Sequence, residues 1–175
     1  MGSLNLGSTG SITATSLSLG VVPCFSARMT NNNAGHGGFT TDGTSSPYTP
    51  IPFDGVDVNR ANCYNGTDAK FTCPVAGIYQ FNVSLISGGT DHWFRGVILH
   101  QSGGTGTPTE IHWSQSDYGG NSSLDFTHCG FSCLYPCSIG DKVWVVLHTS
   151  QNGTESVYSG SGGKWSIFSG HMIST

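Results

Sequence analysis

Two segments place an aromatic side chain directly beside hydrogen-bonding side chains. His92–Arg95 has the sequence HWFR, and His112–Tyr118 has the sequence HWSQSDY. Sugar sites use this combination, because the C–H face of a pyranose stacks on an aromatic ring while polar side chains bond the hydroxyl groups. The planar fork of Arg95 also suits a carboxylate, which favours an acidic sugar such as a sialic acid. The candidate ligand-binding residues are Arg95, His112, Trp113, Gln115, Asp117, Tyr118 and Asn121.

No catalytic motif accompanies these residues. The chain has no Gly-x-Ser-x-Gly elbow, no His-Glu-x-x-His and no Gly-rich phosphate loop. Glu110 and Glu155 are the only glutamates, and no spacing suggests the paired carboxylates of a glycosidase. We therefore expect a binding protein rather than an enzyme.

The charge content argues against nucleic-acid and membrane partners. Charged residues make up 9% of the chain and the net charge is −4, against about 25% charged residues in an average protein. The six basic residues are scattered singly, so the chain has no basic patch for nucleic acid or anionic lipid. No apolar run is long enough to span a membrane, and we expect no membrane insertion.

Cysteines and glycosylation sequons indicate a secreted, extracellular protein. The cysteines are even in number, and their pairing cannot be deduced from sequence: Cys24, Cys63, Cys73, Cys129, Cys133 and Cys137. The last three recur at four-residue steps on one face of an extended chain, so each would more easily bridge to another strand than to its neighbour. Two or three such disulfides would each contribute about 2–4 kcal/mol. Asn65, Asn121 and Asn152 are the expected glycosylation sites, whereas Asn82 lies in a predicted strand and is the least suitable acceptor.

Period-2 alternation and Gly-rich breaks predict an all-β domain. Gly77–Ile86 (GIYQFNVSLI) and Lys142–Thr149 (KVWVVLHT) have the pattern of strands. No segment of ten residues or more has a helical period with caps, and turns recur at 8–15-residue spacing, which favours a β-sandwich. Residues 1–20 are small and polar and lack the charged and apolar regions of a signal peptide, so we expect a flexible lead-in. Residues 21–175 form the expected single domain.

Four motifs in order carry a family resemblance. The most specific is residues 53–81, FDGVDVNRANCYNGTDAKFTCPVAGIYQF, and the others are Cys24–Thr30 (CFSARMT), Gly140–Leu147 (GDKVWVVL) and Trp165–Ile173 (WSIFSGHMI). Together they resemble the globular head domain of complement C1q and its relatives. The resemblance implies a ten-stranded jelly-roll β-sandwich of the C1q/tumour necrosis factor type that assembles as a homotrimer. It rests within 53–81 on Asn59, Tyr64, Phe71, Pro74, Gly77, Tyr79 and Phe81.

The resemblance also bears on individual residues. It implies a Trp in the core of the strand that contains Trp93, which competes with the sugar-stacking interpretation of His92–Arg95. Some relatives bind Ca²⁺ through aspartates in the corresponding loop region, and here Asp117 and Asp125 lie there, so calcium is the one cofactor implied. Single aspartates in Gly-rich loops also form turns. The segment 29–50 is longer than its usual counterpart and is either a surface loop or part of a ligand rim.

The function expected from this sequence is recognition. Molluscan lectins that bind acidic sugars or mannose resemble such a domain without a collagen stalk, and the expected partners are glycans or glycoproteins and further copies of the chain. The predicted protein is a secreted lectin or pattern-recognition molecule of innate immunity. Two alternatives remain open: a cytokine-like trimer that binds a protein ligand, and an extracellular calcium-binding matrix protein.

Overall fold

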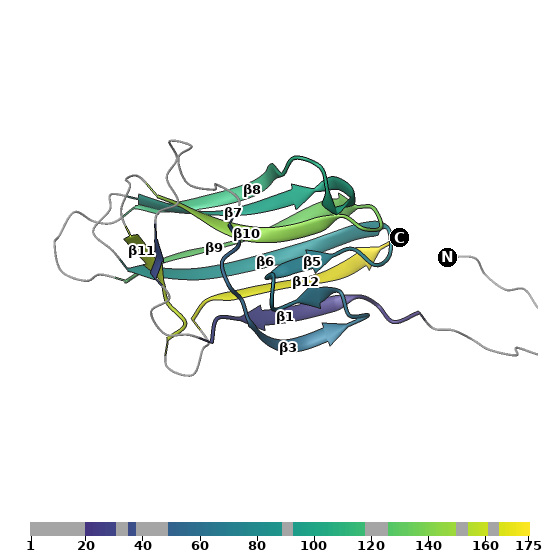
Figure 1. Ribbon diagram of the computed structural model, residues 1–175, viewed down its shortest axis with the longest axis horizontal. Coiled ribbons are helices and arrows are strands. Elements are labelled where there is room, and N and C mark those ends of the chain that lie inside the picture. Colours follow the sequence, from purple (N-terminus) through teal and green to yellow (C-terminus); the bar gives the residue numbers. More distant parts are fainter. Residues whose placement is uncertain are drawn as a thin grey trace, which may run out of the picture.

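The chain folds into two antiparallel β-sheets that face each other across an apolar interior (Figure 1). The computed structural model describes residues 20–30, 35–37, 49–88, 93–117, 126–149, 154–160 and 165–175. The predicted lead-in 1–20 therefore lies outside the described residues except for Gly20, and most of the long segment 29–50 does too. Within the described parts, no helix is long and apolar enough to cross a membrane.

One sheet contains seven strands and the other contains five. The first has the order β2-β11-β6-β12-β1-β3, with β9 paired along the whole of β6, and the second has the order β4-β5-β10-β7-β8. The elements are β1 (Cys24–Arg28), β2 (Gly35–Gly37), β3 (Gly55–Arg60), β4 (Tyr64–Asn65), β5 (Lys70–Thr72), β6 (Gly77–Gly88), β7 (Trp93–Gln101), the 3₁₀ turn η1 (Ser102–Gly104), β8 (Thr109–Asp117), β9 (Phe126–Cys137), β10 (Lys142–Thr149), β11 (Thr154–Val157) and β12 (Ile167–Ser174).

The predicted jelly-roll sandwich is confirmed. The described residues form twelve strands rather than ten because two short strands, β2 and β4, pair beside the longer ones. β10 spans the predicted segment 142–149, and β6 extends the predicted segment 77–86 by two residues. The only helical element in the described residues is the three-residue turn η1, so the expectation of an all-β domain is confirmed there.

Side-chain alternation explains how the two sheets pack. Successive residues of a strand face opposite sides, so Tyr79, Phe81, Val83 and Leu85 of β6 all enter the main core. On β10 both faces are buried: Val143, Val145 and Leu147 join the main core, while Trp144 and Val146 pack with Val97 and Leu99 on the outer side. A strand buried on both faces needs an unbroken apolar run, which is why β10 has the sequence KVWVVL.

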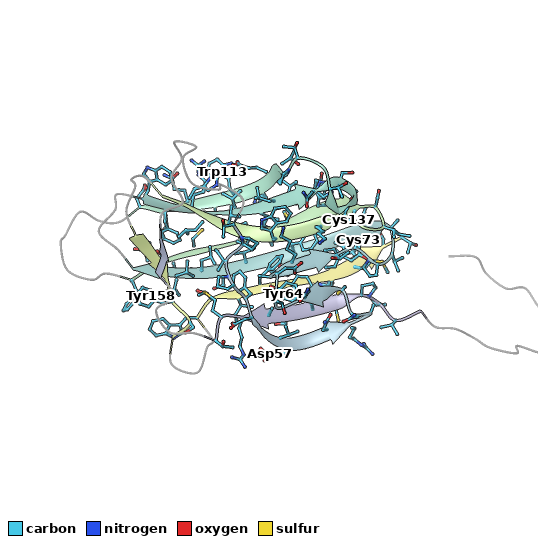
Figure 2. All side chains as sticks on the ribbon, in the orientation of Figure 1. Asp57, Tyr64, Cys73, Trp113, Cys137 and Tyr158 are labelled. Carbon is cyan, nitrogen blue, oxygen red and sulfur yellow. The ribbon has the colours of Figure 1, made fainter. Side chains whose placement is uncertain are left out.

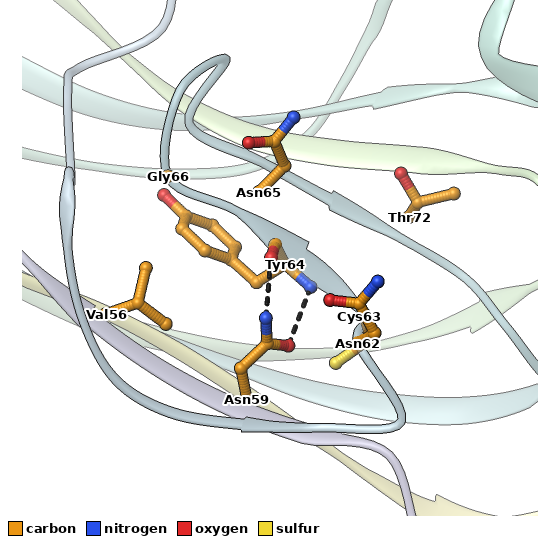
Figure 3. Close-up of a pocket in the computed structure, with 8 residues that line it drawn as sticks. All are labelled: Val56, Asn59, Asn62, Cys63, Tyr64, Asn65, Gly66 and Thr72. Atoms are coloured by element: carbon orange, nitrogen blue, oxygen red, sulfur yellow. Dashed lines mark hydrogen bonds between the residues drawn. The ribbon is translucent and has the colours of Figure 1, made fainter.

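Polar side chains fix the turn between β3 and β4. The Asn59 amide bonds both the N–H and the C=O of Tyr64 (Figure 3), and the Tyr64 hydroxyl donates to the Phe53 carbonyl at 3.0 Å. Burial raises the pKa of Tyr64 well above its ordinary value, so the phenol stays a donor. A hollow of about 420 Å³ lies beside these residues. Both polar atoms of the Asn59 amide already bond the backbone of Tyr64, so these residues stabilise the fold.

Candidate ligand-binding site

The β7–β8 hairpin brings most of the described candidate residues to one face. Its register pairs Trp93 with Asp117, Arg95 with Gln115, and Val97 with Trp113. Trp113, Gln115 and Asp117 alternate with core-facing positions, so they share the outer face of the five-stranded sheet with Arg95. Trp113 lies at the β7–β8 end of the sandwich in Figure 2. The register therefore assembles a set of residues that are about 20 positions apart in the sequence.

Arg95 is the centre of this set. Its guanidinium carbon lies 4.2 Å from the ring centre of Trp113 and 5.3 Å from that of Trp93. Arg95 Nη2 donates to Gln115 Oε1 at 3.2 Å, and Gln115 Nε2 donates to Asp117 Oδ1 at 3.1 Å. The aromatic rings and the amide hold the guanidinium plane in one orientation, and such cation–π contacts contribute about 0.5–2 kcal/mol each. Trp93 is half-buried against Arg95, so the expectation that it fills the core is not met.

Two buried nitrogen atoms at this end of the sheet lack partners. Arg95 Nε and His148 Nε2 are both buried and have no hydrogen-bond partner among the described residues. His148 on β10 is the register neighbour of Arg95, and its Nδ1 lies 3.8 Å from Glu110 Oε1. A buried polar atom without a partner is costly. A ligand oxygen that reached either atom would remove that cost.

A hollow of about 380 Å³ adjoins Trp113. It is lined by Glu110, Ile111, His112 and Trp113 of the edge strand β8. The β7–β8 register shifts between Ile98 and Leu99, so β8 carries a bulge at Ile111. A β-bulge changes the direction in which the neighbouring side chains point. Trp113 is 48% exposed and offers a ring surface at the rim. The position and chemistry of this hollow suit a small polar ring stacked on Trp113.

His112 does not join the Arg95 set. It is paired with the core residue Ile98, and its ring packs against Phe131 of β9 at 5.6 Å between centroids. Since His112 and Trp113 are consecutive in a strand, only one of them can share a face with Arg95. His112 therefore lies apart from Arg95 but lines the neighbouring hollow with Trp113, and its role in ligand binding stays a prediction.

Several candidate residues lie outside the described residues. These are His92, Tyr118, Asn121, Asp125 and Asn152. Asp117 is exposed and its carboxylate accepts the Gln115 amide. Within the described part of the chain, no three His, Cys, Asp or Glu side chains converge as a metal site would require. Calcium binding by Asp117 and Asp125 stays a prediction.

A second aromatic group lies on the seven-stranded sheet, and the sequence analysis missed it. Phe126 packs edge-on against Tyr158 and Trp165, with ring centroids 5.0 and 5.4 Å apart. Phe126 and Trp165 are 56% and 42% exposed, and with Ile86 they line a hollow of about 250 Å³. These residues are far apart in the sequence, and the only local signal is an aromatic residue beside a Gly-rich or polar segment.

The structure contains no disulfide among the six cysteines, all of which lie in described strands and turns. Cys63, Cys73, Cys129 and Cys137 are buried, and Cys24 and Cys133 are partly buried. The expected disulfide framework is thus absent from this structure. Cys73 is a free thiol within the core.

The two facing sheets and their strand order define a domain of the jelly-roll class. The C1q domain model matches residues 37–173, and the chain belongs to the C1q domain family. The chain is 32% identical to the mouse collagen alpha-1(X) chain over 124 residues, which is 71% of this chain and 16% of the collagen. It is 51% identical to the rat complement C1q tumor necrosis factor-related protein 5 over 35 residues, 20% of this chain and 14% of that protein. The chain thus spans a small part of these relatives.

Solved structures show the same fold. The globular domain of the zebrafish complement 1qA protein superposes with a TM-score of 0.60 at 16% identity, covering 86% of this chain and 97% of that one. The Eiger TNF structure from S. frugiperda gives 0.63 at 10% identity, covering 88% and 94%, and murine APRIL gives 0.61 at 10% identity, covering 87% and 99%. These likenesses establish a fold shared by C1q and tumour necrosis factor domains.

Proposed function

We propose that this protein is a secreted recognition protein that binds glycans through the outer face of β7 and β8. The observation that carries the proposal is the stacking of Arg95 on the half-exposed ring of Trp113, beside Gln115 and Asp117. An aromatic plate flanked by N–H donors and carboxylate acceptors matches the two surfaces of a sugar, its C–H face and its hydroxyl groups.

Arg95 favours sugars that carry a carboxylate. Its guanidinium is oriented by two rings and one amide, so little side-chain freedom remains to be lost when it binds an anion. The unpartnered Arg95 Nε and His148 Nε2 would supply further hydrogen bonds. Mannose and other neutral sugars would use the same ring with Gln115 and Asp117 as hydroxyl partners.

We place the contact between copies of a homotrimer on the outer face of the seven-stranded sheet. The strands β6, β9 and β12 contain no Asp, Glu, Lys or Arg. Their outward positions carry Ser, Asn, Gln and His, with exposed Ile78 and Leu134 at 42% and 62%. A broad uncharged face with exposed apolar side chains suits contact with another protein surface. Three copies would leave three β7–β8 sites free, and simultaneous binding to one surface would multiply a weak affinity.

A glycan array with the purified protein tests the proposal. The array is probed once with calcium and once with EDTA, after size-exclusion chromatography has shown that the protein is folded. Binding to a narrow set of glycans supports the proposal, and loss of that binding in EDTA would implicate Asp117 and Asp125. Selective binding that survives EDTA would keep the lectin and make calcium unnecessary.

A blank array from folded protein would overturn the glycan proposal. The family's role in ligand recognition would then point to a protein ligand, as in the cytokine-like alternative. Competition with free N-acetylneuraminic acid and with free mannose separates the two sugar classes, because only the former carries a carboxylate for Arg95. A function in innate immunity would follow from binding to microbial rather than host glycans on the same array.

A further inference from the structure

Two buried thiols from opposite sheets meet at one end of the sandwich. Cys73 follows β5 of the five-stranded sheet, and Cys137 ends β9 of the seven-stranded sheet. They are 1% and 4% exposed and lie close enough to affect each other's pKa, while the Cys73 thiol donates to the Val75 carbonyl at 3.1 Å. Figure 2 shows the two labelled side by side. A covalent bond here would tie the two sheets together.

The backbone around these thiols is fixed by hydrogen bonds. Cys73 N–H donates to the Asp141 carbonyl at 2.8 Å, and Gly140 N–H donates to the Cys73 carbonyl at 2.9 Å. The turn that follows Cys137 is closed by Ser138 N–H, which donates to Asp141 Oδ2 at 2.8 Å. Both cysteines are therefore held in place by the same turn.

Three of the other cysteines are less suited to this bond. Cys133 lies four residues before Cys137 on the same face of β9, so the pair is too far apart along an extended strand to be bridged. Cys129 donates its thiol to the Ser114 carbonyl at 3.1 Å. Cys24 lies on β1 and is paired with Arg60 and His171.

We propose that Cys73 and Cys137 form an inter-sheet disulfide when the chain folds in an oxidising compartment. The oxidant is a disulfide of low molecular weight or of an oxidoreductase. The Cys73 thiolate attacks it, one thiol leaves, and a mixed disulfide forms. The Cys137 thiolate then attacks the Cys73 sulfur and releases the second thiol. Two protein thiols are oxidised, one external disulfide is reduced to two thiols, and each attacking thiol gives its proton to solvent.

Burial dictates when this exchange takes place. It raises the pKa of Cys137 to about 12 and also raises that of Cys73, and only the thiolate reacts. Exchange in the fully folded protein is therefore slow, and the bond forms as the two sheets come together. Once formed it is shielded from reductants. It closes a loop of about 64 residues, which removes much freedom from the unfolded chain.

Peptide mapping of wild-type protein tests the pairing directly. The protein is secreted from eukaryotic cells, alkylated without reduction and digested with trypsin. Cleavage after Lys70 and Arg95 isolates Cys73, and chymotryptic cleavage after Phe131 and Leu134 separates Cys137 from Cys129 and Cys133. A peptide that joins Cys73 to Cys137 is expected. Alkylation of both residues, or a link from Cys73 to another cysteine, would overturn the proposal.

Thermal unfolding with and without reductant gives a second test. Because the loop is long, reduction should lower the melting temperature of wild-type protein by about 10 °C. Cys73→Ala and Cys137→Ala should each abolish that difference, and the double variant should behave like either single one. Cys133→Ala is the matched control and should keep the difference in melting temperature between oxidised and reduced protein. A change in melting temperature on reduction that persists in Cys73→Ala would contradict the pairing. If a variant fails to fold, the peptide mapping of wild-type protein decides whether Cys73 and Cys137 are paired.

Discussion

The side-chain amide of Asn59 replaces a strand partner for Tyr64. Asn59 Oδ1 accepts the Tyr64 N–H at 3.0 Å, and Asn59 Nδ2 donates to the Tyr64 carbonyl at 2.8 Å (Figure 3). Tyr64 in turn stacks on Phe25, with ring centroids 4.7 Å apart. One amide thus joins the end of β3 to β4 and places an aromatic ring in the core.

Removing this amide should destabilise the domain. Asn59→Ala leaves two backbone groups of Tyr64 without their partners, which should lower the free energy of unfolding by about 2 kcal/mol. Asn59→Asp keeps an acceptor for the N–H but faces the carbonyl with a carboxylate, and should be destabilising as well. Urea denaturation measures the free energy of unfolding of both variants. Unchanged midpoints for the two variants would show that solvent substitutes for the amide.

Asp141 should make stability depend on acid pH. Burial acts to raise its pKa, but hydrogen bonds from Gly103 N–H, His100 and Ser138 N–H outweigh it and lower the pKa. The folded state then prefers the carboxylate more than the unfolded chain does. The stabilisation that the Asp141 carboxylate contributes is complete above the pKa of the unfolded chain, which is about 4. It is lost as the pH falls through the lower pKa of the folded state. Asp141→Asn should reduce the fall in unfolding free energy between pH 5 and pH 2.5, and an unaltered pH profile would refute this role.

Arg95 and Trp113 should act together in glycan binding. Trp113→Ala removes the stacking surface, and Arg95→Lys keeps the charge but loses the planar fork, so each should weaken binding about tenfold or more. Trp165→Ala, on the other sheet, is the control and should bind as wild type does. Isothermal titration with the glycan found on the array provides the affinities. Full affinity in Trp113→Ala would move the site away from β7 and β8.

A substitution of Leu134 should test the proposed trimer contact on the outer face of β6, β9 and β12. The Leu134 side chain is 62% exposed on β9, within the uncharged face and opposite Gln80 of β6. Leu134→Asp would bury a carboxylate against a second copy and should shift the protein from trimer to monomer in sedimentation velocity. Ile139→Asp, at a 70% exposed position in the turn after β9, is the comparison and should leave the mass unchanged. A trimer that tolerates Leu134→Asp would place the contact elsewhere.

Asn65 should carry an N-linked glycan when the protein is secreted. It is exposed, and the Thr67 N–H bonds its Oδ1 at 2.9 Å rather than the Nδ2 that is modified. Asn82 is half-buried in β6, paired with Ser169 on one side and Ser132 on the other. Asn65→Gln should therefore remove one glycan from the mass of the intact protein, whereas Asn82→Gln should remove none. The reverse result would disprove the assignment.

Much of the fold follows from local sequence. Alternation in 77–86 and the apolar run in 142–149 predict β6 and β10, because period-2 burial is a property of a single strand. The polar positions of the 53–81 motif, such as Asn59, act within a few residues of themselves, so their structural role also has a local signature. The family resemblance added the jelly-roll sandwich as the architecture.

The candidate site was predicted only in part. The residue types near Arg95 and 112–118 indicated a sugar site, and the structure brings Arg95, Trp113, Gln115 and Asp117 together. Strand alternation and the observed register place His112 on the opposite face from Arg95. The bulge at Ile111 and the pairing of His148 with Arg95 depend on the register of β8, β7 and β10. No local sequence pattern encodes that register.

The sequence by itself determined that this chain is an all-β, weakly charged domain of the C1q family with a polar aromatic segment suited to recognition. Only the tertiary structure decided which side chains meet: Arg95 on Trp113, Cys73 beside Cys137, and Phe126 against Trp165. The physical reason is that burial periodicity arises within one strand. Contacts between strands arise from register, bulges and the packing of two sheets, which the whole chain sets together.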